Sequence, residues 1–201
     1  MKLFVVGFPK SGTSTVHEAL ERSGLKSAHW KCPRGLVGQI IYDNFYMGRE
    51  PFASLDEYDA ITQADVCLPQ DGINYWPNLD FSILAWIRRS HPECLFLLNW
   101  REPALIASSI VRWGNLQDRL AVSDIPGMPR GYGVTTDHLV RWIEAHHEAV
   151  RKFFKDSRFL ELDIAAADAG IKLSEALGVQ LAWWGRANVN PTSADAKLSA
   201  H

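Results

Sequence analysis

The chain has few cysteines, and their spacing fits neither a metal site nor a disulfide framework. Cys32, Cys67 and Cys94 are odd in number and lie far apart, with no CxxC pair or other metal-ligand spacing. Two of them lie in or beside apolar runs that are typical of strands. The pattern predicts reduced, buried thiols of a cytoplasmic protein rather than a secreted disulfide scaffold.

Long apolar runs and a strong net charge are also missing. The N-terminal apolar stretch from Leu3 to Phe8 is too short for a signal-peptide core or a membrane span. The formal net charge of the 201 residues is −2, which indicates no nucleic acid or other polyanion as the general partner. Because 47% of the residues are hydrophobic, we expect an ordinary globular protein with a sizeable core, which binds neither membrane nor nucleic acid.

A glycine-bounded loop near the N-terminus lacks the lysine that nucleoside-triphosphate loops carry. An apolar strand runs into the segment from Gly7 to Thr15, where a helix begins. The motif GxxxxGK[ST] has a lysine directly after its second glycine, but Thr13 occupies that position. The cation of the loop is Lys10, and hydroxyl side chains follow at the helix N-terminus, where free N–H groups favour an anion. The loop is predicted to bind a phosphate-like group without the triphosphate and magnesium apparatus.

A second candidate phosphate-binding element follows a later apolar strand. The run from Leu95 to Trp100 leads into Arg101, and Ser109 lies eight residues after that arginine. A planar guanidinium suits bidentate phosphate binding, and a serine further along a helix can donate another hydrogen bond. Together the two elements resemble those of sulfotransferases that use 3′-phosphoadenosine 5′-phosphosulfate, whose PKSGT(T/S) signature matches Pro9 to Ser14.

The resemblance implies a function and a role for each matching residue. The implied reaction is in-line transfer of a sulfuryl group, without a metal, to a hydroxyl or amine of a small-molecule acceptor. Lys10 would neutralise the bridging oxygen as the bond between phosphate and sulfur breaks. Arg101 and Ser109 would hold the 3′-phosphate of the donor, with Arg186 as a further basic residue of that clamp. The 5′-phosphosulfate would be bound by Pro9, Lys10, Ser11, Gly12, Thr13 and Ser14.

A hydroxyl acceptor needs a base, and the ends of the predicted strands are where to search for one. His29 lies at the expected end of the second strand, where related sulfotransferases can carry a catalytic carboxylate, and histidine suits proton abstraction near neutrality. Asp65, towards the end of the third strand, is the alternative, and Asp71 follows it closely. We favour His29, for which the other interpretation is a structural histidine beside Trp30.

Alternating strands and helices predict one α/β domain of three layers over residues 1–191, with a mainly parallel sheet and a P-loop-like phosphate-binding turn. The Ala- and Ser-rich tail at 192–201 is expected to be poorly ordered. The irregular stretch 114–134 is interpreted either as a lid or as a surface excursion. The predicted strands are 2–8, 25–30, 60–68, 94–100 and 158–163, and the predicted helices are 13–23, 33–45, 79–89, 103–113, 136–155 and 171–177.

Two other function classes stay open at this point. A P-loop metabolite kinase would depend on ATP and magnesium, and the missing lysine after Gly12 weighs against it. A non-catalytic phosphoadenosine-binding protein would keep the clamp without turnover, and the retention of Lys10 argues mildly against that. A strict need for the 3′-phosphate of the nucleotide separates the sulfotransferase from the kinase.

Overall fold

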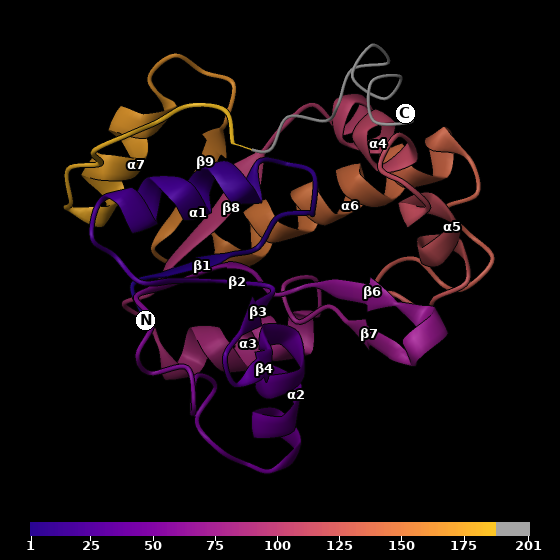
Figure 1. The fold of residues 1–201 in the computed structure, drawn as a ribbon, viewed down its shortest axis with the longest axis horizontal. Helices are drawn as coiled ribbons and strands as arrows, with labels where there is room; N and C mark the ends of the chain where they lie inside the picture. The colour runs from indigo at the N-terminus through magenta and orange to yellow at the C-terminus, as the bar shows by residue number, and fades with distance from the viewer. Residues whose placement is uncertain (188–201) are drawn as a thin grey trace, which may run out of the picture.

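A central sheet of five parallel strands organises the molecule (Figure 1). The strands are β1 (Leu3–Val5), β2 (Ser27–His29), β5 (Ala60–Gln63), β8 (Leu95–Trp100) and β9 (Phe159–Asp163). Their order across the sheet is β2-β5-β1-β8-β9, and the short strands β3 (Lys31–Cys32) and β4 (Gly35–Leu36) extend it antiparallel beyond β2. The computed structural model describes residues 1–187, which form a single α/β domain; the predicted tail lies outside the described residues.

The central strands β1 and β8 are almost entirely apolar because both faces of the sheet are covered. In β1, Leu3 and Val5 point to one buried cluster, while Phe4 between them points to another, as the pleat of a strand requires. In β8, Leu95 and Leu97 join the first cluster and Phe96 joins the second. The continuous apolar runs of the sequence are therefore the signature of a sheet buried in the middle layer of three.

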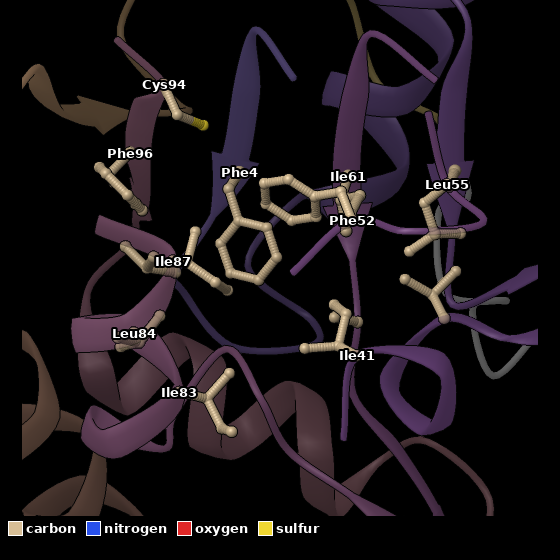
Figure 2. Close-up of a cluster of buried hydrophobic side chains, with 14 of the residues drawn as sticks. Phe4, Ile41, Phe52, Leu55, Ile61, Ile83, Leu84, Ile87, Cys94 and Phe96 are labelled. Carbon is tan, nitrogen blue, oxygen red and sulfur yellow. The ribbon is translucent and has the colours of Figure 1, made fainter. Parts of the chain in front are cut away.

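Helices form the two outer layers (Figure 1). Helices α1 (Thr13–Arg22) and α7 (Ala169–Leu177) cover one face. Helices α2 (Val37–Tyr46), α3 (Phe81–Ser90) and α6 (Thr136–Phe154) supply the cluster on the other face. Figure 2 shows this second cluster, in which Phe4, Ile61 and Phe96 of the strands meet side chains of α2 and α3. No helix within residues 1–187 has the length and apolar character that crossing a membrane requires.

A third buried cluster surrounds Phe8, the residue after the first loop glycine. Helices α4 (Pro103–Val111) and α5 (Leu116–Ala121) contribute Ile110 and Leu120 to it, and α6 contributes Trp142. The rings of Phe8 and Trp142 meet edge to face with centroids 4.7 Å apart. The cluster anchors the predicted phosphate loop to the helices that follow β8.

The predicted strand at 60–68 is divided into two strands, β5 and Val66–Leu68, because the chain leaves the central sheet after Gln63. Residues Val66–Leu68 form β6, which pairs antiparallel with β7 (Ile73–Tyr75) in a separate hairpin, joined through a 3₁₀ turn at Pro69–Asp71. The break falls at Asp65, whose buried carboxylate accepts two amide hydrogen bonds in place of a sheet position.

Two other expectations also need correction. The helix expected to open at Pro33 begins at Val37, since the chain first forms the β3–β4 hairpin, with Gly35 at a φ of 126° that a helix cannot contain. The irregular stretch 114–134 contains α5. The remaining predicted elements exist with ends that differ by a few residues.

Candidate functional site

The predicted phosphate loop lies at the carboxyl end of β1, between the ends of β5 and β8. Gly12 is the N-cap of α1 and has a φ of 88°, in the left-handed region that favours glycine. A Cβ on Gly12 would also lie 2.5 Å from Cδ1 of Ile164, which follows β9. Backbone conformation and space therefore both require glycine at this end of the loop.

Asn99 of β8 fastens the loop from the side. Its Nδ2 donates to the carbonyl of Ser11 at 3.0 Å and to the Ser11 hydroxyl at 2.5 Å. That hydroxyl in turn donates to the carbonyl of Phe8 at 2.5 Å. A Cβ on Gly7 would come within 2.0 Å of Asn99 Oδ1, so this first glycine makes room for the asparagine. The buried Ser11 side chain, predicted to bind the donor, thus shapes the loop from within.

Two threonine hydroxyls at the start of α1 also have partners inside the protein. Thr13, at the position of the P-loop lysine, is buried and its Oγ1 donates to Gln63 Oε1 at 3.2 Å. Thr15 is buried as well, and its Oγ1 accepts from the N–H of Ala187 at 3.3 Å. Ser14 between them is half-exposed, which makes it the better placed hydroxyl for a ligand.

The N-terminus of α1 has the features that favour a bound anion. Its first turn contains no acidic residue, and within the described part of the chain no side chain caps it. The N–H groups of Thr15 and Val16 both donate to the Gly12 carbonyl, so the first intrahelical bonds begin there. The N–H groups of Thr13 and Ser14 precede those bonds, and together with the helix dipole they favour a bound anion.

Four cationic side chains gather beside this helix start. The Nη1 of Arg101, just after β8, donates to the carbonyl of Lys10 at 3.2 Å. Burial, then the positive charges of Arg112 and Arg186, lower the pKa of Arg101. Burial and Arg101 lower the pKa of Lys10 to about 8. Within residues 1–187 neither Arg101 nor Arg112 forms an ion pair with a carboxylate. A cluster of mutually repelling cations favours an anionic ligand, which would relieve the repulsion.

Helix α4 and the residues after it supply the rest of the basic region. Ser109 of α4 is buried, and the Nη1 of Arg112 donates to the hydroxyl of Ser108. Trp113 lies under Lys10, whose Nζ is 3.1 Å from the centroid of the ring. Neither Arg112 nor Trp113 was predicted from the sequence; both directly follow α4, and their closeness in the chain to Ser109 is the signal that could have found them.

His29 ends β2, and β5 lies between β2 and β1, the strand that leads to Lys10. Its ring stacks on that of His17 in α1, with centroids 4.9 Å apart, and its Nδ1 is 3.2 Å from Thr62 Oγ1. Burial, then the neighbouring His17, lower the pKa of His29 to about 4. The side chain is thus uncharged at neutral pH and packs against α1.

Asp65 is connected to both ends of the loop. Its carboxylate accepts from Gln63 Nε2 at 3.0 Å and from Asn78 Nδ2 at 3.2 Å. The same Asn78 amide donates to the Gly7 carbonyl at 2.9 Å, and Gln63 accepts from Thr13. Burial raises the pKa of Asp65 to about 7, although the two amide hydrogen bonds oppose the shift. A carboxyl group with this pKa exchanges its proton near neutrality.

Comparison with protein families gives one match to nearly the whole described chain. A family model described as "Sulfotransferase domain" matches residues 2–186. The matched range includes the loop, Asp65, Arg101, Ser109 and Arg186. A comparison with curated proteins found no match. Among the residues that the structure describes, no three His, Cys, Asp or Glu side chains gather as a metal site would require.

Proposed function

The chain belongs to the sulfotransferase domain family, and on that premise we propose that it moves a sulfuryl group from 3′-phosphoadenosine 5′-phosphosulfate to a hydroxyl or amine of a small-molecule acceptor. The observation that carries the proposal is the gathering of Lys10, Arg101, Arg112 and Arg186 beside the N-terminus of α1. A ligand that matches this arrangement has anionic groups at two places, as the donor has at its 5′ and 3′ positions.

The chain offers a separate set of groups to each end of such a donor. The first amides of α1, Ser14 and Lys10 suit the 5′-phosphosulfate, because they combine N–H donors with a positive charge. Arg101 and Ser109 suit the 3′-phosphate, with Arg186 beside them. The donor itself supplies the sulfuryl group, whereas the protein binds, orients and neutralises charge.

Lys10 is the residue that we propose stabilises the leaving group. Its ammonium is half-buried and, with a pKa of about 8, stays mostly protonated at neutral pH. Negative charge grows on the oxygen that bridges phosphorus and sulfur as the transfer proceeds, so a cation held there acts more strongly on the transition state than on the ground state. Removal of one such electrostatic group typically costs about 10²–10³-fold in rate.

We propose Asp65 rather than His29 as the base for a hydroxyl acceptor. A pKa of about 7 makes Asp65 an effective proton acceptor near neutrality, whereas a pKa of about 4 makes His29 a weak one. Asp65 also lies two residues after the end of β5, the strand next to β1, and is tied to the loop through Asn78 and Gln63. The amide hydrogen bonds hold its carboxylate in one orientation.

Binding measurements test the donor before any acceptor is known. Calorimetry would compare adenosine 3′,5′-bisphosphate, the same nucleotide without its 3′-phosphate, and ATP with magnesium. We expect tight binding of the bisphosphate and roughly 10- to 100-fold weaker binding without the 3′-phosphate, since a charge-assisted hydrogen bond contributes about 1.5–3 kcal/mol. Preferred binding of ATP with magnesium would instead identify a kinase.

Transfer is then measured with ³⁵S-labelled donor and a panel of small hydroxyl and amine acceptors. We expect labelled product that needs Lys10. Tight bisphosphate binding without transfer to any acceptor would favour the non-catalytic binding protein.

A further inference from the structure

Lys10 is held at two points that lie far apart in the sequence. Its backbone has a φ of 67°, unusual for a residue with a side chain, and its carbonyl accepts from Arg101. Its side chain extends over Trp113, with Nζ 3.1 Å from the ring centroid. The same lysine therefore contacts the end of β8 through its backbone and the end of α4 through its ammonium.

The ring under Lys10 is fixed by packing. Trp113 is half-buried and packs against the cluster that contains Ile110 and Leu116, so the indole has a defined position relative to α4. An unsupported lysine has four rotatable side-chain bonds and populates many rotamers. The face of an indole attracts an ammonium, and it also shields one side of that group from water.

We propose that Trp113 is the positioning residue of Lys10: its indole face holds the ammonium on the Arg101 side of the loop, in place before the donor binds. The inference rests on the proposed sulfuryl transfer, in which Lys10 meets the developing charge. Trp113 itself touches neither donor nor acceptor in this scheme and acts through the lysine.

The proposed roles of Ser109 and Trp113 meet at the same end of α4. Ser109, the proposed 3′-phosphate ligand, lies in the last turn of α4, and Trp113 is the second residue after that helix, where its N–H donates to the carbonyl of Ile110 at 3.1 Å. This short connection sets the separation between the group that receives the 3′-phosphate and the ring that holds Lys10. A donor that fits Ser109 and Arg101 would find the ammonium at a fixed distance, as efficient in-line transfer requires.

The first test is nuclear magnetic resonance of the free protein labelled with ¹³C-lysine, with Lys10→Arg identifying the Lys10 signal. An ammonium over an indole face has its ε-methylene protons shifted upfield by the ring current. We expect this shift in the wild type and in Trp113→Phe, which keeps an aromatic face, and its loss in Trp113→Met and Trp113→Leu. Trp86→Leu serves as the matched control, because Trp86 is equally half-buried but packs on Phe45 in a different buried cluster from that of Trp113.

Kinetics then separate positioning from general packing. We expect Trp113→Met to lower kcat about 10- to 100-fold, the range that small misplacements of a reacting group produce, with bisphosphate affinity changed less than about threefold. Trp113→Phe should retain most of kcat, and Trp86→Leu nearly all of it. Trp113→Leu repeats the measurement with a different side chain, so a single poorly folding variant does not decide the result.

The pH profile supplies a readout that loss of packing alone would not change. Within residues 1–187, the charged groups that act on Lys10 are Arg101 and, beyond it, Arg112 and Arg186. In the wild type kcat should fall above a pH of about 8 as Lys10 loses its proton, and in Trp113→Met this fall should move to higher pH because water reaches the ammonium.

Three results would overturn the proposal. Normal kcat in Trp113→Met, with the ring-current shift lost, would leave sulfuryl transfer intact and remove Trp113 from it. Absence of the shift in the wild type would remove the contact itself. If the wild type transfers no sulfuryl group, the proposed function fails and the positioning role fails with it, whatever the resonance of Lys10.

Discussion

Replacing Asp65 by asparagine separates two effects of one buried carboxyl group. Burial raises its pKa from the ordinary 3.8 to about 7, so the folded protein binds the proton more tightly than the unfolded chain. A shift of this size corresponds to roughly 4 kcal/mol of lost stability once the group is ionised in both states. The same ionised carboxylate is the form that would accept a proton from the acceptor. Stability and activity thus make opposite demands on Asp65.

The sign of the pH dependence follows from the raised pKa. The destabilisation is absent below pH 3.8, grows as the pH rises and is fully present above a pH of about 7. Asparagine carries no charge, so Asp65→Asn should gain stability over the wild type at pH 8.5 and gain little at pH 5. The full difference will not be recovered, because the amide replaces an acceptor that faces the donors of Gln63 and Asn78. We expect a net gain of about 2 kcal/mol at pH 8.5 after that loss.

Urea denaturation followed by tryptophan fluorescence at pH 5 and pH 8.5 measures the gain, and labelled-donor turnover measures the loss. Turnover should fall about 10²–10⁴-fold if Asp65 is the base. The exposed Asp71 provides the matched control, since Asp71→Asn removes a nearby carboxylate without removing a buried charge. A variant Asp65→Asn that is less stable than the wild type at pH 8.5 would refute the electrostatic argument. One that keeps full turnover would refute the catalytic argument.

The other predictions concern the donor site and the second base candidate. Lys10→Met should lower kcat by about 10²–10³-fold with little change in the urea midpoint, and an unchanged kcat would remove Lys10 from the transition state. Arg101→Ala should weaken bisphosphate binding about 10- to 100-fold in calorimetry while affecting the nucleotide without a 3′-phosphate much less; equal losses for both ligands would contradict a 3′-phosphate contact. His29→Asn, which retains a group for Thr62, should leave turnover within about threefold of the wild type, whereas a hundredfold loss would return the role of base to His29.

Elements buried on both faces were predictable from sequence because their apolar runs are continuous. The apolar runs that form β8 and β1 fit few structures other than a buried strand. The spacing of Gly7 and Gly12 indicates the turn that follows β1. What the spacing did not show is why each glycine is needed. Gly7 makes room for Asn99, which comes from the neighbouring strand, and that contact joins residues more than ninety positions apart.

The division of the strand at 60–68 was not predicted, because its local pattern fits two structures. The apolar run at 60–68 has no glycine or proline before Pro69, so nothing local shows that it divides between two sheets, apart from the charged Asp65 within it.

His29 lies at the end of a strand, as expected from the sequence, but the direction in which its side chain points depends on how that strand pairs in the sheet. Ser27 and His29 both contact Thr62, so the ring faces α1 and stacks on His17.

The absence of lysine after Gly12 takes on a physical meaning once the contacts of Thr13 are known. A triphosphate concentrates its negative charge at one end, and a lysine directly after Gly12 would neutralise that charge. Thr13 is instead buried and donates to Gln63, while the positive charge comes from within the loop at Lys10 and from the next strand end at Arg101. Positive charge is thus spread from the start of α1 towards α4 rather than concentrated at the N-terminus of α1. Such a distribution fits a nucleotide with two separated anionic groups better than it fits ATP, and it is the reason that the 3′-phosphate should dominate the binding measurements.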